Sequence, residues 1–489
     1  MKIINALLSV LITGTTAFSQ NETDVLRYSQ HQSIGTARYV GMGGAFGALG
    51  GDLSAIHTNP ASAAIYRSSE FSFSPSIFVN GAKSLHYQTP ASDSRSSVKL
   101  STIGFVLTDK GSSSDYSGWS ATQFAVTFKK INNYNDRIFI TGTNMESSML
   151  QDFNSRIQGQ NPSDIYAYNS FDAGLAWKAY LLNPMDSLDT TTYQSMATGG
   201  VHQQKSIIRS GGMNELSISL GANYDNKLFM GMTIGFPMVN YTEEAIHIET
   251  DEADTIAYLQ SFQMNETFHT SGTGFNIKLG VILRPNSWIR IGGAFHSPTY
   301  LNLSDAYSAY INADFDSVPE WSSSNSTQYL ASSPDGQFDY RITTPLRLMG
   351  SMAFILQKKG LISMDYEWLD YTMGNLSSDL YGFSNENSVL NQKYGSASNV
   401  RVGAEWRELP FSLRAGFGLQ GSPYNSGNLK SKTTYSLGLG IREKAFFIDF
   451  AYVFSQYNED YYLYSPAIVA ASTIEHSNHQ IQSTLGFKF

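Results

Sequence analysis

The chain contains no cysteine among its 489 residues. A disulfide scaffold, a catalytic thiol and a cysteine-ligated metal are therefore excluded. A lipoprotein is excluded as well, because its lipid is attached to a cysteine behind the cleavage site. Charged residues are scarce, at 15% of the chain compared with roughly 25% in soluble domains. The net charge of −9 argues against nucleic acid as a partner.

Long apolar runs are also missing. Behind the N-terminal segment, no run of about 18 apolar residues could form a transmembrane helix. At the N-terminus, Lys2 precedes a short apolar run from Ile3 to Ile12, and Ala17-Phe18-Ser19 supplies small residues for cleavage. This pattern predicts a signal peptide over residues 1–19, with the mature chain starting near Gln20.

Aromatic residues and glycine are abundant instead. The chain has 29 Tyr, 29 Phe and 41 Gly, but only 14 Pro. An exported chain of this composition, without a membrane helix, is typical of an outer-membrane β-barrel. A secreted all-β enzyme or adhesin shares these features, so composition alone leaves those alternatives open.

Period-two alternation in segments of about ten residues favours the barrel. It is clearest at the C-terminus, and similar alternation recurs near 216–224, 228–236, 411–420, 435–442 and 446–454. One face of the last segment carries Ile481, Ser483, Leu485, Phe487 and Phe489. We expect this face to meet lipid and Phe489 to be part of the signal read by the barrel-assembly machinery.

The connections alternate between short and long. Asp225-Asn226 and Pro285-Asn286 are tight turns, as expected on the periplasmic side of a barrel. Long polar stretches, expected to be outer loops, lie near 242–272, 301–337, 373–397, 421–431 and 458–477. The fold class predicted is all-β: a transmembrane antiparallel β-barrel over residues 69–489.

Parity restricts the number of strands to even values. Both ends of such a barrel face the periplasm, so the count must be even, and we predict about 14 strands. This count requires 119–144 to be one strand, the third, with a kink or bulge. The interruption falls on Asn132, Asn133, Asn135 and Asp136. The largest outer loop is then about 145–214, and its apolar patches suggest that it folds locally.

Residues 20–68 do not alternate and are expected to form a hatch, a plug of short helices inside the barrel. Residues 33–51 are rich in glycine, but no GK[ST] follows and no strand precedes them, which argues against a phosphate-binding loop. Asp52 is predicted to cap a helix. Asn59-Pro60 is predicted to start a second one, with Pro60 at its first position.

The sequence resembles the FadL/TodX (OMPP1) family of outer-membrane transporters for long-chain fatty acids and other hydrophobic compounds. The residues that carry the resemblance are Gly41 to Gly51, Asp52 to Ile56, Asn59-Pro60-Ala61, Gly274 to Leu303 and Arg401 to Pro423. It implies a 14-stranded barrel closed by a hatch. We predict that Asn59, Pro60 and Ala61 hold this hatch and gate transport, the alternative being that Asn59-Pro60 only forms a turn. The resemblance also implies a lateral opening at the kinked third strand. Ser62, where the family often has glycine, and the large 145–214 insertion depart from the pattern and leave the ligand open.

Several lumen-facing positions carry charged residues, which could take part in catalysis or form ion pairs. Paired carboxylates could serve acid–base catalysis, but mixed charges on adjacent strands favour ion pairs that fill the lumen and hold the hatch. The members of this expected charge ladder are Asp365, Glu367, Arg401, Glu405, Arg407 and Arg414, with Arg442 and Asp449 nearby. No G-x-S-x-G is present, and no enzyme is expected. His31 and His57 could ligate haem iron, although no haem motif surrounds them and no cofactor or metal is expected.

These features predict a passive channel for hydrophobic small molecules, such as long-chain fatty acids, in the outer membrane of a Gram-negative bacterium. Its expected partners are the hydrophobic ligand, outer-membrane lipids and the barrel-assembly machinery, and we expect a monomer. Three alternatives stay open: a scaffold or secretion-associated barrel, an outer-membrane barrel enzyme, and uptake of haemin or aromatic compounds.

Overall fold

The computed structural model describes residues 21–110, 118–186, 189–319, 325–357, 359–425 and 431–489. The signal peptide predicted over 1–19 lies outside the described residues. Within them, no helix is both long and apolar enough to cross a membrane.

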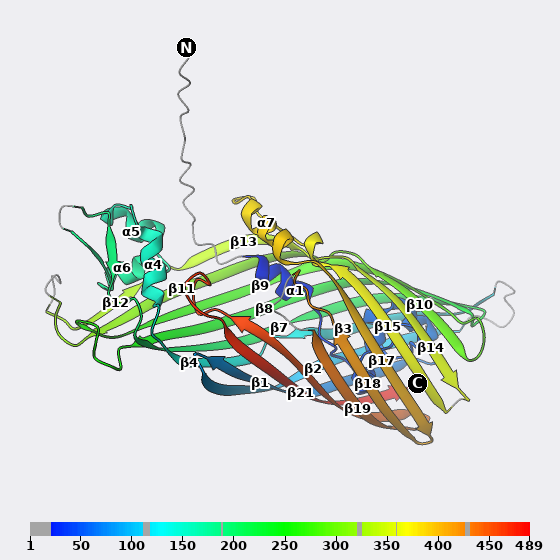
Figure 1. Cartoon of the computed structure of the whole chain (residues 1–489). Helices are drawn as coiled ribbons and strands as arrows, with labels where there is room; N and C mark the ends of the chain where they lie inside the picture. The colour runs from blue at the N-terminus through cyan, green and yellow to red at the C-terminus, as the bar shows by residue number, and fades with distance from the viewer. Residues whose placement is uncertain (1–20, 111–117, 187–188, 320–324, 358, 426–430) are drawn as a thin grey trace, which may run out of the picture.

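The structure is a closed antiparallel β-barrel of 14 strands, preceded by short helices (Figure 1), which confirms the fold class predicted from the alternation. Three of the 14 are split in two along their length. In order around the wall they are β1 (Glu70–His86), β2 (Thr89–Asp109), β3 (Trp119–Asn133) with β4 (Asp136–Asn144), β7 (Val201–Tyr224), β8 (Leu228–Thr250), β9 (Leu259–Leu283), β10 (Ile289–His296) with β11 (Tyr300–Phe315), β13 (Gly336–Thr343) with β14 (Arg347–Leu356), β15 (Gly360–Asp370), β17 (Ser396–Glu408), β18 (Phe411–Gln420), β19 (Lys432–Arg442), β20 (Phe446–Tyr461) and β21 (Ser472–Lys488).

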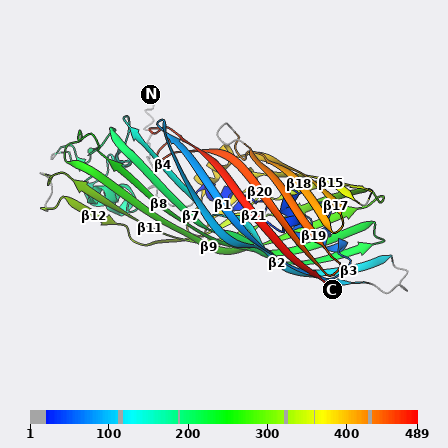
Figure 2. The ribbon, with the colours of Figure 1, turned by 90° about the horizontal axis from the view of Figure 1, so that it is seen from below.

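The first and last strands close the barrel. β1 pairs with β21 in a register that places Phe71 opposite Phe487 and Ile77 opposite Ile481. Beyond β21, the Phe489 N–H donates to the Ser69 carbonyl oxygen at 3.1 Å. β1 and β21 lie side by side in Figure 2, with the C-terminus at the end of the barrel that carries the tight turns. We call this end the short-turn end and the opposite one the long-loop end.

The outer surface is that of a membrane-spanning barrel. Phe450 on β20 is 56% exposed, whereas its neighbour Ala451 faces the lumen and is 6% exposed. Large apolar side chains such as Leu413 and Leu439 are likewise exposed on neighbouring strands. So much exposed apolar surface is unfavourable in water but matches a lipid bilayer. The predicted register of β20 is therefore confirmed.

Several strands are longer than the alternation predicts. β7, β8 and β9 have 24, 23 and 25 residues, whereas about 9–11 suffice to cross a bilayer. β7 begins at Val201, so residues 201–214 belong to a strand and not to the predicted loop. Parts of the stretches near 242–272 and 301–337 are strand as well. Outside the apolar belt both faces of a strand can be polar, which hides the alternation there.

The segment between β4 and β7 folds locally, on the long-loop end. It contains α4 (Met149–Ile157), α5 (Pro162–Tyr168), α6 (Ala173–Lys178) and the small hairpin of β5 (Leu182–Pro184) and β6 (Tyr193–Ser195). Its apolar side chains, among them Phe153 and Leu175, pack on Phe262, Ile311 and Phe315 of the extended strands. Further short elements at the long-loop end are β12 (Gln328–Ser332), η2 (Tyr371–Met373), β16 (Asn375–Ser377) and α7 (Ser384–Lys393).

The N-terminal residues 21–68 lie within the barrel and form four short helices. These are α1 (Glu22–Ser29), α2 (Ala37–Gly41), α3 (Leu53–Thr58) and the 3-10 helix η1 (Pro60–Ile65). The Asp52 side chain accepts the Ser54 N–H and caps α3, as predicted. Pro60 occupies the first turn of η1, also as predicted, although the helix is 3-10 and not α. We call residues 21–68 the hatch.

Candidate functional site

The predicted triad Asn59, Pro60 and Ala61 lies where the hatch meets the wall. The Asn59 side-chain N–H groups donate to the carbonyl oxygens of Gly47 (2.7 Å) and Val281 (3.2 Å). Its Oδ1 accepts the Ala61 N–H at 3.0 Å. Asn59 therefore ties two hatch segments to β9 while it caps η1.

Glycines in the wall make room for this contact. A Cβ on Gly280 of β9 would overlap Asn59 Oδ1, and a Cβ on Gly231 of β8 would overlap the Pro60 carbonyl group. Backbone therefore packs directly on backbone, so the hatch can approach the wall closely.

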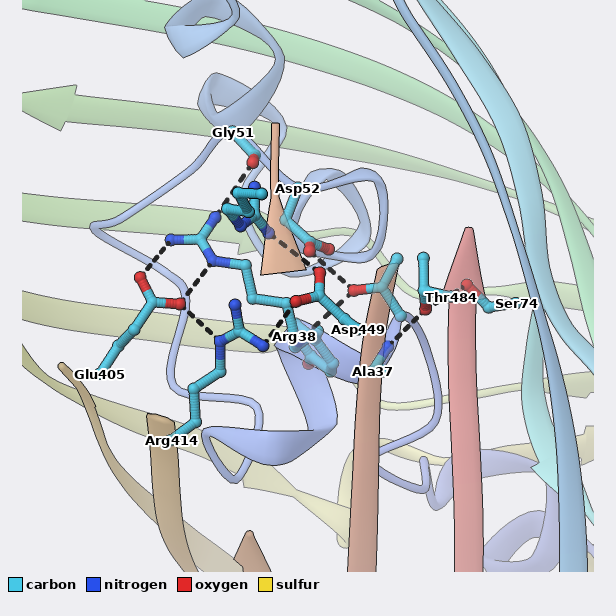
Figure 3. A network of polar contacts seen from close by, with 12 residues as sticks. Ala37, Arg38, Gly51, Asp52, Ser74, Glu405, Arg414, Asp449 and Thr484 are labelled. Atoms are coloured by element: carbon cyan, nitrogen blue, oxygen red, sulfur yellow. Dashed lines mark hydrogen bonds and ion pairs between the residues drawn. The ribbon is translucent and has the colours of Figure 1, made fainter. Parts of the chain in front are cut away.

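A network of arginines and carboxylates joins the hatch to β17, β18 and β20 (Figure 3). Arg38 of α2 pairs with Glu405, with 2.9 Å between Nε and Oε2. Glu405 also accepts from Arg407 and from Arg414, whose Nε lies 2.6 Å from Oε2. Arg414 Nη1 lies 2.7 Å from Asp449 Oδ1 and so extends the network to β20. The predicted residues Glu405, Arg407 and Arg414 are thus brought together around a hatch arginine.

A second group is centred on Glu367. Its carboxylate pairs with Arg401 at 2.9 Å and with Arg347 at 2.8 Å. Asp365 differs from the expected ladder, since its carboxylate accepts the backbone N–H groups of Phe46 and Gly47, both at 2.9 Å. The expected charge ladder is thus two clusters and one carboxylate that binds the hatch backbone directly.

A third buried group was not predicted from the sequence. His57 of α3 contacts Glu215 Oε1 through Nδ1 at 3.0 Å and Thr127 Oγ1 through Nε2 at 2.7 Å. Glu215 also pairs with Lys278 and accepts from Asn276 at 2.9 Å. Both ring nitrogens of His57 are engaged, which leaves neither for haem iron. No group of three or more His, Asp or Glu residues in the described part of the chain could hold a metal.

Burial governs the protonation of His57. Its side chain is shielded from solvent among β3, β7 and β9, and this burial lowers the pKa of His57 from 6.5 to about 4. The neutral imidazole donates from Nδ1 to the Glu215 carboxylate and accepts at Nε2 from the Thr127 hydroxyl.

The third strand breaks at Tyr134 and Asn135, between β3 and β4, as the parity argument predicts. The break is bonded to the hatch. Asn132 Oδ1 accepts the Gln32 N–H at 3.0 Å, and the Asn133 N–H donates to Gln32 Oε1 at 3.1 Å. Two regions that the sequence links only through family resemblance are therefore in direct contact.

Of the remaining predicted residues at the break, Asn135 is hydrogen-bonded to the wall and Asp136 lies near a histidine of the wall. Asn135 Nδ2 donates to Asn133 Oδ1 at 2.6 Å and to the Gly211 carbonyl oxygen at 3.0 Å. Asp136 Oδ2 lies 3.8 Å from His476 Nδ1 of β21.

The strand pairing has a gap next to this break. β2 pairs with β3 only between Thr102 and Asp109. In the residues described, the other part of β2 forms a ladder with β1 alone, and β4 forms one with β7 alone. Ser84 Oγ of β1 donates to the Phe139 carbonyl oxygen at 2.6 Å, so β4 lies against inward side chains of β1. Two strand edges without ladder partners therefore face the same gap.

A cavity of about 830 Å³ lies between α1 and the surrounding strands. Its lining includes Asn132 and Tyr134 at the break, together with aromatic and charged groups. The Arg27 guanidinium lies 4.2 Å from the centroid of the Tyr241 ring. Arg209 Nε lies 2.7 Å from Glu243 Oε2. The cavity thus offers both ring faces and paired charges to an occupant.

The sequence matches no model of a known protein family, and no curated protein sequence is similar to it. Solved structures are similar over nearly the whole chain. A crystal structure of a Pseudomonas aeruginosa FadL homologue matches with a TM-score of 0.57 and 11% identity, over 94% of this chain and 99% of that one. The chain has the FadL/TodX fold.

Other structures with the FadL/TodX fold agree. The Pseudomonas putida toluene transporter TodX matches with a TM-score of 0.52 and 12% identity, over 94% of this chain and 100% of that one. The CymD monoaromatic hydrocarbon channel matches with a TM-score of 0.50 and 11% identity, over 94% and 98%. The resemblance based on Asn59-Pro60-Ala61 is therefore confirmed at the level of the FadL/TodX fold.

Proposed function

We propose that the chain is a passive channel for hydrophobic small molecules in the outer membrane of a Gram-negative bacterium, with long-chain fatty acids as the principal substrate. The exposed apolar belt and the closed antiparallel barrel support the location. Support for hydrophobic small molecules as the substrate class comes from structures of the same fold whose names describe a toluene transporter and a monoaromatic hydrocarbon channel.

One observation carries the proposal: the gap between β2 and β4. Unpaired backbone groups cost several kcal/mol each in lipid, so an open strand edge is tolerated only where it lines a cavity. The outward side chains Val98 and Leu100 on the free part of β2 are apolar and exposed, which supports a gap that begins at membrane depth. An apolar solute that enters this gap can pass from the lumen to the lipid without crossing water.

The hatch supplies the control in this proposal. Gln32 bonds to Asn132 and Asn133, so a shift of the hatch alters the break in the third strand. We propose that a ligand in the cavity of about 830 Å³ displaces this contact and then leaves through the gap. Asn59, Pro60 and Ala61 hold the hatch against the wall during this step.

A cross-link across the gap tests the route. Arg137 Nε of β4 lies 3.0 Å from Asp93 Oδ2 of β2, across the gap. Because the chain has no native cysteine, Asp93→Cys with Arg137→Cys can be joined selectively by a short bis-maleimide. In a host without its own channel, we expect the cross-link to reduce uptake of radiolabelled oleate at least fivefold at equal surface abundance.

The matched control is Val79→Cys with Ser96→Cys, because these residues already face each other on paired strands. The same reagent should leave its uptake unchanged. Normal oleate uptake by the cross-linked Asp93–Arg137 variant would refute the lateral route. Parallel assays with labelled toluene and haemin test the substrate, since uptake of either in place of oleate would refute the fatty-acid assignment.

A further inference from the structure

Four arginines share two carboxylates at the junction of hatch and barrel, and Figure 3 shows Arg38 and Arg414 with both carboxylates. Glu405 pairs with Arg38, Arg407 and Arg414. Asp449 pairs with Arg414 at 2.7 Å and with Arg442 at 3.0 Å. The ion-paired groups therefore carry two more positive than negative charges.

Donor groups in this network are left over. Arg414 Nη2 and Arg442 Nε are buried and have no hydrogen-bond partner among the described residues. The Arg414 side chain is fully buried. An unsatisfied buried donor is costly, more so when it is charged. Both nitrogens belong to arginines that already contact Asp449.

The other carboxylates close by are engaged elsewhere. Asp52 accepts from the Thr36 hydroxyl at 2.7 Å and from the Ser54 N–H at 2.9 Å. Glu70 accepts from the Tyr66 hydroxyl at 3.3 Å. Neither forms an ion pair with an arginine within the described residues, but Asp52 lies near Arg38, and Glu70 lies near Arg442 and Lys488, so these carboxylates offset only part of the positive charge.

Further positive charge lies beside Arg442. Its guanidinium lies 4.7 Å from the centroid of the Phe447 ring, and Lys488 Nζ lies 5.7 Å from the same centroid. Both cations therefore lie close to one buried aromatic ring at the short-turn end, where β20 begins and β21 ends.

The network is open to solvent on one side. The Arg407 side chain is 35% exposed and that of Arg442 is 17% exposed, whereas Arg38 and Arg414 are buried. An anion can therefore reach the outer arginines from the short-turn end. Guanidinium groups bind oxyanions through paired N–H donors, which gives charge and geometry together.

We propose that Arg407, Arg414 and Arg442 form an oxyanion site at the short-turn end of the barrel, which takes a phosphate or a carboxylate group. The bound oxyanion accepts from Arg407 and Arg442 on the solvent side, and the buried Arg414 behind them adds positive charge that the oxyanion offsets. The site is independent of what the channel carries, because its residues line neither the 830 Å³ cavity nor the gap.

Isothermal titration calorimetry on the full chain in detergent tests the proposal, with sodium phosphate, acetate and octanoate at constant ionic strength. We expect saturable binding of phosphate or of a carboxylate. Arg407→Gln and Arg442→Gln should each weaken it at least fivefold. Arg442→Lys should be intermediate, because it keeps the charge but loses the planar donor pair. Phosphate binding identifies a free oxyanion, and octanoate binding without acetate binding identifies an amphiphile head group.

Lys359→Gln is the matched control, since Lys359 lies at the same end but is exposed and paired with Glu408 at 3.0 Å. It should bind the anion as the wild type does. Heat-modifiable mobility on gels reports folding, and the partly exposed Arg407 provides a variant that folds even if Arg442→Gln does not. No saturable binding of any of the three anions, or equal affinities of wild type and Arg407→Gln, would overturn the site. Oleate uptake does not enter this test, so its outcome is separate from that of the transport proposal.

Discussion

Arg38 of the hatch pairs with Glu405 of β17, with 2.9 Å between Nε and Oε2, and both side chains are buried. Glu405 forms ion pairs with three arginines, so its loss leaves three buried or partly buried cations without this partner, whereas the loss of Arg38 removes only one of the three ion pairs. Glu405→Gln should therefore destabilise the protein by about 3–5 kcal/mol, as expected when buried charges lose their partner. Arg38→Met should cost less, about 1.5–3 kcal/mol. Urea unfolding in lipid vesicles measures both, and equal losses would contradict this asymmetry.

Gly280 leaves space for the hatch, so Gly280→Ala should loosen it. The new Cβ would overlap Asn59 Oδ1, and overpacking of this kind costs about 1–3 kcal/mol. We expect faster proteolysis of residues 21–68 and a higher ion conductance in planar bilayers. Gly350→Ala on β14 is the control, because no atom lies within 4 Å of the added Cβ. Identical behaviour of the two variants would argue against close packing of hatch and wall.

Asn59 itself should control uptake. Asn59→Ala removes the donors to the carbonyl oxygens of Gly47 and Val281 and the acceptor for Ala61. We expect a folded barrel with altered oleate uptake. Asn59→Asp keeps the acceptor but sets a carboxylate against two carbonyl oxygens, so it should be at least as severe. Uptake and surface abundance are measured together, and normal uptake at normal abundance would remove Asn59 from the gate.

The membrane-spanning part of the fold could be predicted from the sequence, because lipid forces one face of each strand to be apolar. Phe450 and Ala451 alternate in the structure as in the sequence pattern. Parity then predicts 14 strands and an interruption within Asn132 to Asp136, and the structure breaks the strand there, at Tyr134 and Asn135. The long-loop end could not be predicted in this way. Glu243 and Glu244 are consecutive strand residues, and no apolar face marks them.

The candidate site was predictable only where a local signature exists. Asp52 and Pro60 could be placed because caps and first-turn prolines act over two or three residues. Arg38 gave no such signal, since its partner Glu405 is 367 positions away. The pairing of His57 with Glu215 was missed for the same reason. Long-range pairing depends on the barrel register, which single-strand patterns do not fix.

Phe450 and Ala451 offer a direct test of the register in the membrane. Phe450→Arg puts a charge on the lipid-facing side of β20 and should cost about 2–4 kcal/mol if it lies near the bilayer midplane. Ala451→Ser adds one hydroxyl on the lumen side and should be tolerated far better. Folding free energies in phosphatidylcholine vesicles measure both changes. Equal stabilities would show that β20 faces lipid with its other side.

His57 should make the stability of the hatch depend on pH. Burial lowers the pKa of His57 to about 4 in the folded chain, while the unfolded chain protonates it near 6.5. Its contribution is therefore complete above pH 6.5 and is lost as the pH falls towards 4. At pH 5 the free energy of unfolding is lower by about 2 kcal/mol, because the unfolded chain binds a proton that the folded chain does not.

The groups around His57 are Glu215 of β7, Lys278 of β9 and Lys129 of β3, and both lysines oppose its protonation. His57→Gln replaces the imidazole with a neutral amide that keeps a donor and an acceptor but does not titrate. Urea unfolding of wild type and variant in vesicles at pH 7 and pH 5 separates the contribution of His57 to the free energy of unfolding from those of the carboxylates and the other histidines. The wild type should lose about 2 kcal/mol more than His57→Gln between these pH values. Parallel losses in both proteins would mean that His57 is solvated or already protonated in the folded hatch.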